Sequence, residues 1–266
     1  MNWIVQALTS TLGRKLIMAL TGAFLCLFLV VHLSGNLQLL KDDGGESFNK
    51  YAEFMGHNPL IQAGYIGNFF FIALHIVTSI LLTLRNRKAR PVAYAYSKEG
   101  KSSAWSSRNM GILGTVILIF LVVHLQNFWF KVKFGVSLPP AAVYDGVEYK
   151  DVYTLSKVAF SELWIVVLYL ISMVGLAFHL SHGFASMFQS LGLNHKKYNY
   201  LIKFASYEFG LLIPAGFACI PLLMFLEVQV PVLFVLGGLG ALAVGYGVLL
   251  SKTIKTNEAT RKEAAI

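Results

Sequence analysis

The chain of 266 residues has few charged side chains, and this scarcity excludes the broadest class of proteins. Asp, Glu, Lys and Arg together make up 13% of the sequence, whereas 56% of the residues are hydrophobic. A soluble domain carries about twice that charged fraction. The composition therefore predicts an integral membrane protein. The formal charge of +9 lies mainly in the connections between apolar segments, which indicates membrane topology rather than a nucleic-acid partner.

Cysteine is also scarce, and this limits the redox and cofactor chemistry of the chain. Cys26 and Cys219 lie in different apolar segments, and the motif Cys-x-x-Cys-His is missing. A covalently attached haem is therefore excluded. We expect no disulfide and interpret both residues as small buried hydrophobic side chains. We also expect no cleavable signal peptide, because the apolar run after Lys15 is too long for one and predicts a retained helix.

Long hydrophobic runs, by contrast, are abundant. A membrane-spanning helix needs about 20 mostly apolar residues, and the segments that reach this length are 16–40, 60–84, 109–130, 158–188, 208–226 and 231–250. A single helix from 208 to 250 would be about 64 Å long. Because the hydrocarbon layer is about 30 Å thick, we expect a turn at residues 227–230. Pro214 and Pro221 should kink the fifth segment.

These segments predict an all-α fold. We expect one transmembrane helix bundle over residues 1–251, with five core helices and a sixth C-terminal helix, followed by a polar basic tail at 252–266.

The charges of the connections predict the orientation of the chain. The second connection carries seven basic residues: Arg85, Arg87, Lys88, Arg90, Lys98, Lys101 and Arg108. The first carries only Lys41 and Lys50, against four acidic residues. Because basic connections stay in the cytoplasm, both termini should be cytoplasmic, and the connection at 131–157 should form an ordered outer loop. Five spans would instead place the basic tail outside.

Four histidines stand inside four different apolar segments: His32, His75, His124 and His179. Hydrocarbon offers an imidazole no hydrogen-bond partner, so such residues indicate function. At 1.5 Å per residue, His32 and His124 lie about 25 Å from the cytoplasmic boundary and His75 lies about 15 Å from it. His179 lies about 33 Å from the outer boundary. These depths predict an outer pair, His32 with His124, and an inner pair, His75 with His179.

Two imidazoles at one depth on facing helices are typical of bis-histidine haem ligation. The pattern therefore predicts two haem b groups, each with its iron held by one pair. Two other interpretations remain open: structural hydrogen bonds between helices, and a proton relay, which usually includes carboxylates such as Glu162. His182 is an alternative to His179, because residues three apart share a helix face. We interpret His57 and His195 as interfacial.

Several runs resemble one known family: HLSGNL at 32–37, RNRKARP at 85–91, VHL at 123–125, FHLSHGF at 178–184 and FQSLG at 188–192. Over residues 10–226, including the helix order, the chain resembles the di-haem cytochrome b membrane anchor of succinate dehydrogenase and fumarate reductase. This is the succinate:quinone oxidoreductase family. In that family the ligand on the fourth helix precedes a glycine by four residues, which favours His179, ahead of Gly183, over His182.

The resemblance implies an electron-transfer and quinone-reactive subunit of a respiratory chain in a bacterial cytoplasmic membrane. Its partners would be the flavoprotein and iron–sulfur subunits of succinate dehydrogenase, an enzyme of the tricarboxylic acid cycle, or of fumarate reductase. Its quinone would be menaquinone. The chain itself has no flavin or iron–sulfur motif, so we expect it not to oxidise succinate by itself. Two features depart from the family. Its anchors usually have five spans, and Ala177 stands where some fumarate reductases carry a glutamate of a proton path.

Further residues are candidates for contacts with these cofactors. Quinone chemistry needs a proton donor or acceptor, for which we consider Glu53, His57 and Glu162. Haem propionates favour cationic and hydrogen-bonding groups. The candidates near the cytoplasmic boundary are Arg14, Lys15, Trp105, Ser106 and Arg108.

Two other functions fit the same histidine pattern. The chain could be a di-haem b cytochrome that anchors another respiratory dehydrogenase, of the hydrogenase or formate dehydrogenase type. It could also be a haem-free transporter whose histidines relay protons. The partner subunits distinguish the first alternative, and the absence of a b-type absorption band would distinguish the second.

Overall fold

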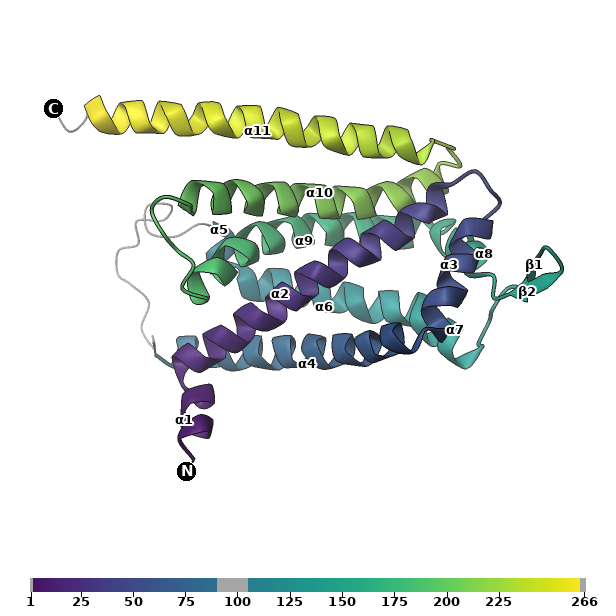
Figure 1. Ribbon diagram of the computed structural model, residues 1–266, viewed down its shortest axis with the longest axis horizontal. Coiled ribbons are helices and arrows are strands. Elements are labelled where there is room, and N and C mark those ends of the chain that lie inside the picture. Colours follow the sequence, from purple (N-terminus) through teal and green to yellow (C-terminus); the bar gives the residue numbers. More distant parts are fainter. Residues whose placement is uncertain (1, 90–104, 264–266) are drawn as a thin grey trace.

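The computed structural model describes residues 2–89 and 105–263 and is almost entirely helical (Figure 1). Six described helices are long and apolar enough to cross a membrane: Thr11–Leu40, Pro59–Lys88, Met110–Phe134, Leu163–Ser190, Asn199–Phe225 and Val232–Lys252. The predicted all-α bundle with a sixth C-terminal helix is therefore confirmed, and the chain is a multi-pass membrane protein. Large apolar side chains such as Leu27, Ile112 and Leu233 are exposed on the spans, as expected where lipid surrounds the protein.

The first half of the chain forms α1 (Trp3–Thr9), α2 (Thr11–Asn36), the 3₁₀ turn η1 (Leu37–Leu40), α3 (Glu46–His57) and α4 (Pro59–Lys88). Next come α5 (Trp105–Arg108), α6 (Met110–His124), the π-helical segment η2 (Leu125–Phe130) and α7 (Lys131–Phe134). The remaining elements are β1 (Ala142–Tyr144), β2 (Val147–Tyr149), α8 (Val152–Phe160), α9 (Leu163–Ser190), α10 (Asn199–Phe225) and α11 (Val232–Glu263).

The helix bounds differ from the expected segments at three places. The fourth span begins at Leu163 rather than at 158, because Glu162 is extended (φ −88°, ψ 110°) and separates α8 from α9. The fifth begins at Asn199 rather than at 208, since a long lysine stem such as that of Lys203 can lie along an apolar surface. The expected tail at 252–266 continues α11 as helix to Glu263.

The turn between the last two spans lies where the sequence predicts it. α10 continues through Pro214 and Pro221 and ends at Phe225, and α11 begins at Val232. Glu227 lies between them with φ 53°. Residues other than glycine rarely adopt a positive φ. The chain therefore reverses sharply at this position.

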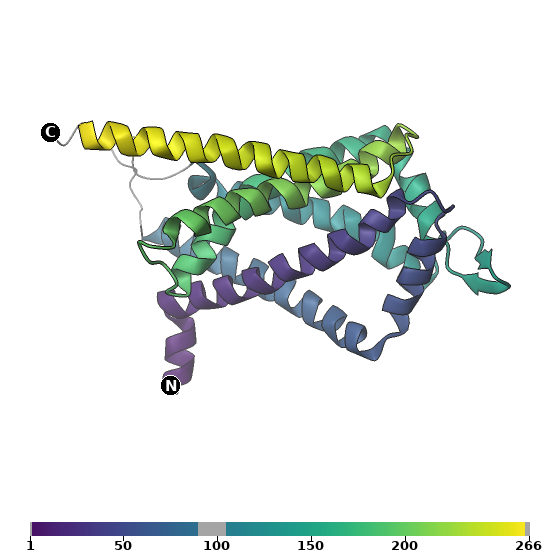
Figure 2. The ribbon, with the colours of Figure 1, turned by 45° about the horizontal axis from the view of Figure 1, so that its top comes forward.

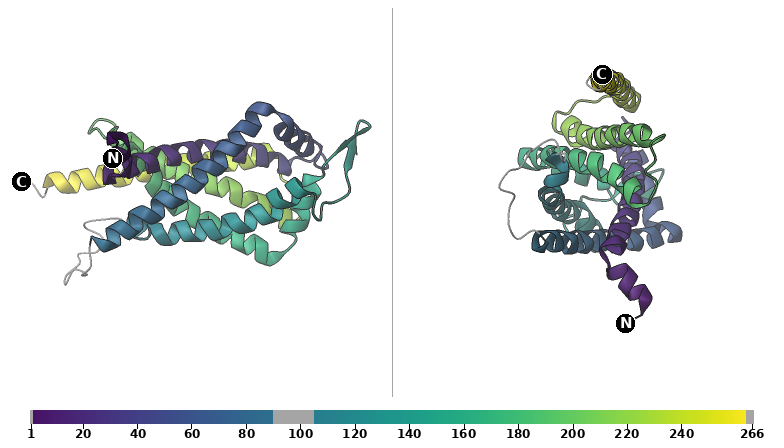
Figure 3. Two further views of the ribbon diagram at one scale, coloured as in Figure 1. Left: turned by 90° about the horizontal axis from the view of Figure 1, so that it is seen from below. Right: turned by 90° about the vertical axis from the view of Figure 1, so that its left-hand side faces the viewer.

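The bundle has two different ends. Both termini lie at one end, and the β1–β2 hairpin lies at the other (Figure 3). We call them the basic end, which includes the start of α2, the end of α4 and α5, and the hairpin end, which includes α3, β1–β2 and α8. Arg90, Lys98 and Lys101 of the basic connection lie outside the described residues.

The hairpin end is ordered by local hydrogen bonds, in agreement with the predicted ordered loop. Asp145 and Gly146 both have positive φ, 53° and 76°, as a tight hairpin turn of two residues requires. Asn49 on α3 is buried, and its amide donates to the Tyr144 hydroxyl (3.1 Å) and to the Asp151 carboxylate (3.0 Å). Asp151 also accepts from the backbone N–H of Thr154 (2.9 Å) and so begins α8. These bonds tie α3, the hairpin and α8 together.

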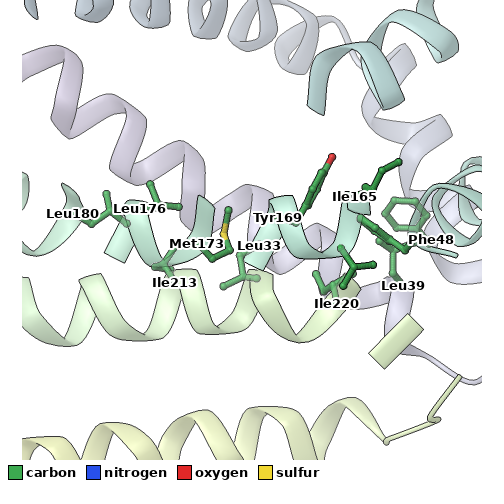
Figure 4. Packing of buried hydrophobic residues seen from close by; sticks show 12 residues of the cluster. Leu33, Leu39, Phe48, Ile165, Tyr169, Met173, Leu176, Leu180, Ile213 and Ile220 are labelled. Carbon is green, nitrogen blue, oxygen red and sulfur yellow. The ribbon is translucent and has the colours of Figure 1, made fainter. Parts of the chain in front are cut away.

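A tightly packed core of α2, α9 and α10 supports the remaining helices (Figure 4). Leu33, Met173 and Ile213 are buried in this cluster. Gly210 lets α10 approach α9, because a Cβ atom there would collide with the Ser181 side chain and with the backbone of α9. Small residues are the usual means of close helix packing in membranes. α11 lies outside this core, alongside α10 (Figure 2).

Candidate functional site

The outer histidine pair joins α2 and α6. The ring centroids of His32 and His124 are 5.9 Å apart, and the rings are inclined by 86°. Phe28 stacks on His32 at 5.1 Å and Phe120 stacks on His124 at 5.6 Å. Further rings against the pair belong to Phe217, Phe128 and Tyr169. The pair therefore lies in an aromatic, water-poor environment within the bundle.

The inner pair joins α4 and α9. The ring centroids of His75 and His179 are 6.4 Å apart, and their planes are inclined by 63°. On α2, a Cβ atom added to Gly22 would lie 3.7 Å from His75 Cε1, so glycine leaves space beside this ring. Among the described residues, His182 makes no aromatic ring contact. The structure thus joins the same two pairs that the depth estimate predicts.

The separation of the two histidine pairs along the bundle is similar when it is measured on α2 and on α9. On α2, Thr21 contacts His75 of the inner pair, and His32 of the outer pair follows eleven residues later, about 16 Å along the axis. On α9, Tyr169 contacts His124 of the outer pair, and His179 follows ten residues later, about 15 Å along the axis. Because α2 starts at the basic end, the inner pair lies nearer to that end.

Thr21 contacts one ring nitrogen of His75. Its hydroxyl, in a side chain only 1% exposed, lies within hydrogen-bond distance of the backbone carbonyls of Ile17 (2.9 Å) and Met18 (3.1 Å). The same oxygen lies 2.9 Å from His75 Nδ1. A histidine that binds a metal through Nε2 carries its proton on Nδ1. With the hydroxyl proton on a backbone carbonyl, the Thr21 oxygen is placed to accept that Nδ1–H.

The Nδ1 atoms of the other histidines have different surroundings. His124 Nδ1 lies 3.2 Å from the Tyr169 hydroxyl, which can accept in the same way. His32 Nδ1 lies 3.2 Å from the amide nitrogen of Asn36, whose amide also donates to the His32 carbonyl (2.7 Å). His179 Nδ1 is buried and has no hydrogen-bond partner in the described part of the chain. An acceptor for the second nitrogen orients metal-binding histidines. Thr21 and Tyr169 are placed as such acceptors, whereas the Asn36 amide nitrogen can only donate.

The donor set favours one kind of metal group. Within residues 2–89 and 105–263, no cluster of three or more His, Cys, Asp or Glu side chains could hold a metal ion. Protein zinc sites use three or four such ligands, so a bare metal ion has too few donors here. Two imidazoles suffice where a porphyrin supplies the other four donors. In each pair the two rings come from different helices, with centroids 5.9 and 6.4 Å apart, so both imidazoles could bind one iron. The residues therefore fit a haem.

The quinone candidates lie at the ends of helices. His57 Nδ1 and Glu53 Oε1 are 3.1 Å apart at the end of α3, and His57 is exposed. Glu162 is exposed at the start of α9 and forms no helix-capping hydrogen bond there. The structure brings Glu53 and His57 together, and within the described residues Glu162 forms no hydrogen bond or ion pair with either of them.

The propionate candidates gather at the basic end. Arg14 and Lys15 belong to the first turn of α2, and Arg85 of α4 donates to the carbonyl of Thr9 just before it (3.5 Å). Trp105, Ser106 and Arg108 form α5, and the Trp105 ring lies 5.6 Å from that of Phe178, the residue before His179. α5 is therefore adjacent to the segment that carries an inner histidine.

Sequence reasoning missed the side chains that orient the histidines. Asn36 was within reach, since it lies four residues after His32 on the same helix. Thr21 and Tyr169 are 54 and 45 residues from the rings they contact, and no sequence signal marks such pairs. Glu208 was also missed as a functional candidate, because the fifth span was expected to begin with it.

Comparison of this chain with protein-family models, with curated proteins and with solved structures gave no match. Any function assigned to this chain therefore rests on the geometry of the site and on the motifs of the sequence.

Proposed function

We propose that this protein is the membrane-anchor cytochrome b subunit of a succinate:quinone oxidoreductase. It would pass electrons between an iron–sulfur subunit and a quinone through two b haems. The observation that carries the proposal is the pair of facing histidine sites on four spans, with ring centroids 5.9 and 6.4 Å apart. The resemblance of the runs at 32–37 and 178–184 to that family supports succinate:quinone chemistry.

The proposed haem ligands are His32 with His124 and His75 with His179. Each haem iron supplies one-electron redox chemistry when bound, with a potential that its axial ligands and surroundings tune. The side chains of the protein prepare the imidazoles for this role. Thr21 would accept the Nδ1–H of a His75 that binds iron through Nε2, and the rings of Phe28, Phe120 and Phe217 keep water from the outer pair. Arg14, Lys15 and α5 would receive the anionic propionates of the inner haem.

The two ends of the bundle would serve different partners in a bacterial cytoplasmic membrane. The basic end, with both termini, would face the cytoplasm by the positive-inside rule. The flavoprotein and iron–sulfur subunits would dock there, close to the inner pair. The quinone, in this proposal menaquinone, would react near the hairpin end, where Glu53 and His57 offer a proton-exchanging pair.

A reduced-minus-oxidised absorption spectrum of haem-replete protein tests the proposal. We expect a b-type band and about two haems per chain, because each pair holds one iron. His124→Ala should remove about one haem and spare the inner site. His182→Ala is the matched control and should retain both. Absence of a b-type band would refute the cytochrome, and retention of two haems in His124→Ala would refute the pairing.

Co-purifying subunits distinguish this anchor from that of another dehydrogenase. A flavoprotein and an iron–sulfur protein in the isolated complex would support succinate chemistry. A nickel or molybdenum subunit would overturn it.

A further inference from the structure

A hollow between α10 and α11 contains a buried carboxylate that the proposed function does not use. It has a volume of about 510 Å³, and its lining includes Phe204, Glu208, Leu212, Ala243, Gly247 and Ser251. The walls are mostly apolar. Binding sites for small molecules usually measure about 300–1,000 Å³ and combine apolar walls with a few polar groups. The hollow has this volume and lining, and it is wide open on its outer side.

The Glu208 carboxyl group has no hydrogen-bond partner among the described residues. The residue is 9% exposed, and both carboxyl oxygens are buried without a hydrogen bond in the described part of the chain. An unpaired ionised carboxylate in an apolar site is strongly unfavourable. The neutral acid avoids this cost and can donate one hydrogen bond and accept others. Glu208 therefore has unused donor and acceptor capacity.

Glu208 lines the hollow next to Gly247. At Gly247, a Cβ atom would lie 3.1 Å from the Phe204 ring, a tight contact, and 3.6 Å from Glu208 Oε1, an ordinary contact. Ser251 donates its proton to the Val248 carbonyl (2.8 Å) and retains its lone pairs. The hollow thus offers a carboxylic acid and a hydroxyl acceptor on apolar walls.

The position along the helix agrees with a ligand that enters from the membrane. Glu208 follows Lys203 by five residues on α10, about 7.5 Å along the axis. Lys203 belongs to the basic end, where long cationic side chains reach the membrane surface. The carboxyl group is therefore just below the interfacial layer, where the polar heads of lipid-soluble molecules lie.

We propose that this hollow binds the hydroxyl-bearing head of a lipid-soluble molecule through Glu208 in its protonated form. A hydroxyl matches the site because it can donate to one oxygen and accept from the acid at once. The chemical class includes isoprenoid hydroquinones and lipid alcohols such as diacylglycerol. Because its residues are distinct from the histidine pairs, the site stands whether or not those pairs hold haem.

Labelling with dicyclohexylcarbodiimide tests the site in the full chain, reconstituted in phosphatidylcholine vesicles. The O–H of a carboxylic acid adds across one C=N bond of the reagent: the proton goes to nitrogen and the oxygen to carbon. The O-acylisourea formed rearranges to an N-acylurea without loss of atoms. Peptide mass spectrometry then measures the labelling rate of Glu208. Glu208→Gln should remove this label, whereas Glu148→Gln, which changes an exposed carboxylate on β2, should leave it unchanged.

Protection experiments identify the ligand. Decyl-hydroquinone and dioctanoylglycerol are the two probes, and the dimethyl ether of the hydroquinone is the matched control without a hydroxyl. A bound probe at about ten times its Kd should slow labelling roughly tenfold by mass action. Protection of Glu208 by decyl-hydroquinone would identify a hydroquinone as the ligand, and protection by dioctanoylglycerol would identify a lipid alcohol. Ala243→Leu, which fills the hollow but keeps Glu208, should slow labelling and abolish protection.

Three results would overturn the proposal: no labelling of Glu208, unchanged labelling in Ala243→Leu, or equal protection by the dimethyl ether. The last would mean that the hollow accepts apolar chains without recognising a head group. Absence of the b-type band, together with normal protection of Glu208 by a probe, would contradict the haem proposal and leave this one standing.

Discussion

At the scale of single residues, the groups that contact the second ring nitrogen of each histidine influence how it can act. Thr21 is the clearest case, because its hydroxyl can donate to a backbone carbonyl of α2. Its oxygen, 2.9 Å from His75 Nδ1, can then accept an Nδ1–H. This hydrogen bond favours the tautomer of His75 whose Nε2 is free.

Thr21→Val should weaken haem binding at the inner site selectively. Valine has a similar shape but no acceptor, and loss of such a partner lowers metal affinity roughly 10- to 100-fold. Haem titration of the apoprotein, followed by absorbance, measures the effect. Thr115→Val is the control, since the Thr115 hydroxyl donates only to Gly111 on its own helix (2.9 Å). Equal losses in the two variants would contradict the role of Thr21.

At the scale of elements, the contact between α9 and α10 sets the positions of the site helices. Gly210 is the point of closest approach, where a Cβ atom would lie 2.8 Å from the Ser181 backbone nitrogen and 2.9 Å from the Ala177 carbonyl oxygen. Backbone atoms cannot rotate away as a flexible side chain can. The two helices would have to separate to admit any side chain.

Gly210→Ala should destabilise the bundle by about 1–3 kcal/mol, the usual cost of overpacking. Thermal unfolding of the detergent-solubilised protein measures it. Gly67→Ala on α4 is the matched control: the space around Gly67 is open, and alanine favours a helix over glycine by about 1 kcal/mol. If Gly67→Ala destabilised the protein as much as Gly210→Ala, close packing at Gly210 would not be the cause of the loss.

α11 contributes to the bundle without entering the histidine sites. It packs mainly on α10, with a smaller contact to η1, and none of the histidine ring contacts involves it. Truncation after Glu227 should therefore keep about two haems per chain, measured as the haem-to-protein ratio. The thermal midpoint should fall, because the apolar face of α10 and Glu208 lose their cover. Loss of either haem would show that α11 supports the sites.

At the scale of the whole molecule, the asymmetry of charge predicts orientation in the membrane. The six spans place both termini at one end, together with the basic residues of α2 and α4 (Figure 1). Reporter fusions after Lys252 and within the β1–β2 turn at Gly146 test the orientation. The first should report a cytoplasmic location and the second an external one. The reverse result would exclude docking of a cytoplasmic partner at the basic end.

The sequence by itself predicted the helical class, six apolar segments and two histidine pairs, with His182 left as an alternative to His179. Hydrophobic length and the rise per residue depend only on the chain, so the order of the spans and the depth of His32 or His75 follow from counting. Helix starts were less predictable. The α10 start at Asn199 was missed because charged residues such as Lys203 and Glu208 obscure the hydropathy of a helix.

Only the tertiary structure decided which side chains surround the histidines. Thr21, Tyr169 and Phe217 reach their rings from other helices, and Glu208 becomes a buried acid only because α11 covers it. Rotation and close approach of helices depend on small contacts such as those of Gly210 and Gly247. These contacts join residues far apart in the chain, and periodicity along one helix contains no information about them.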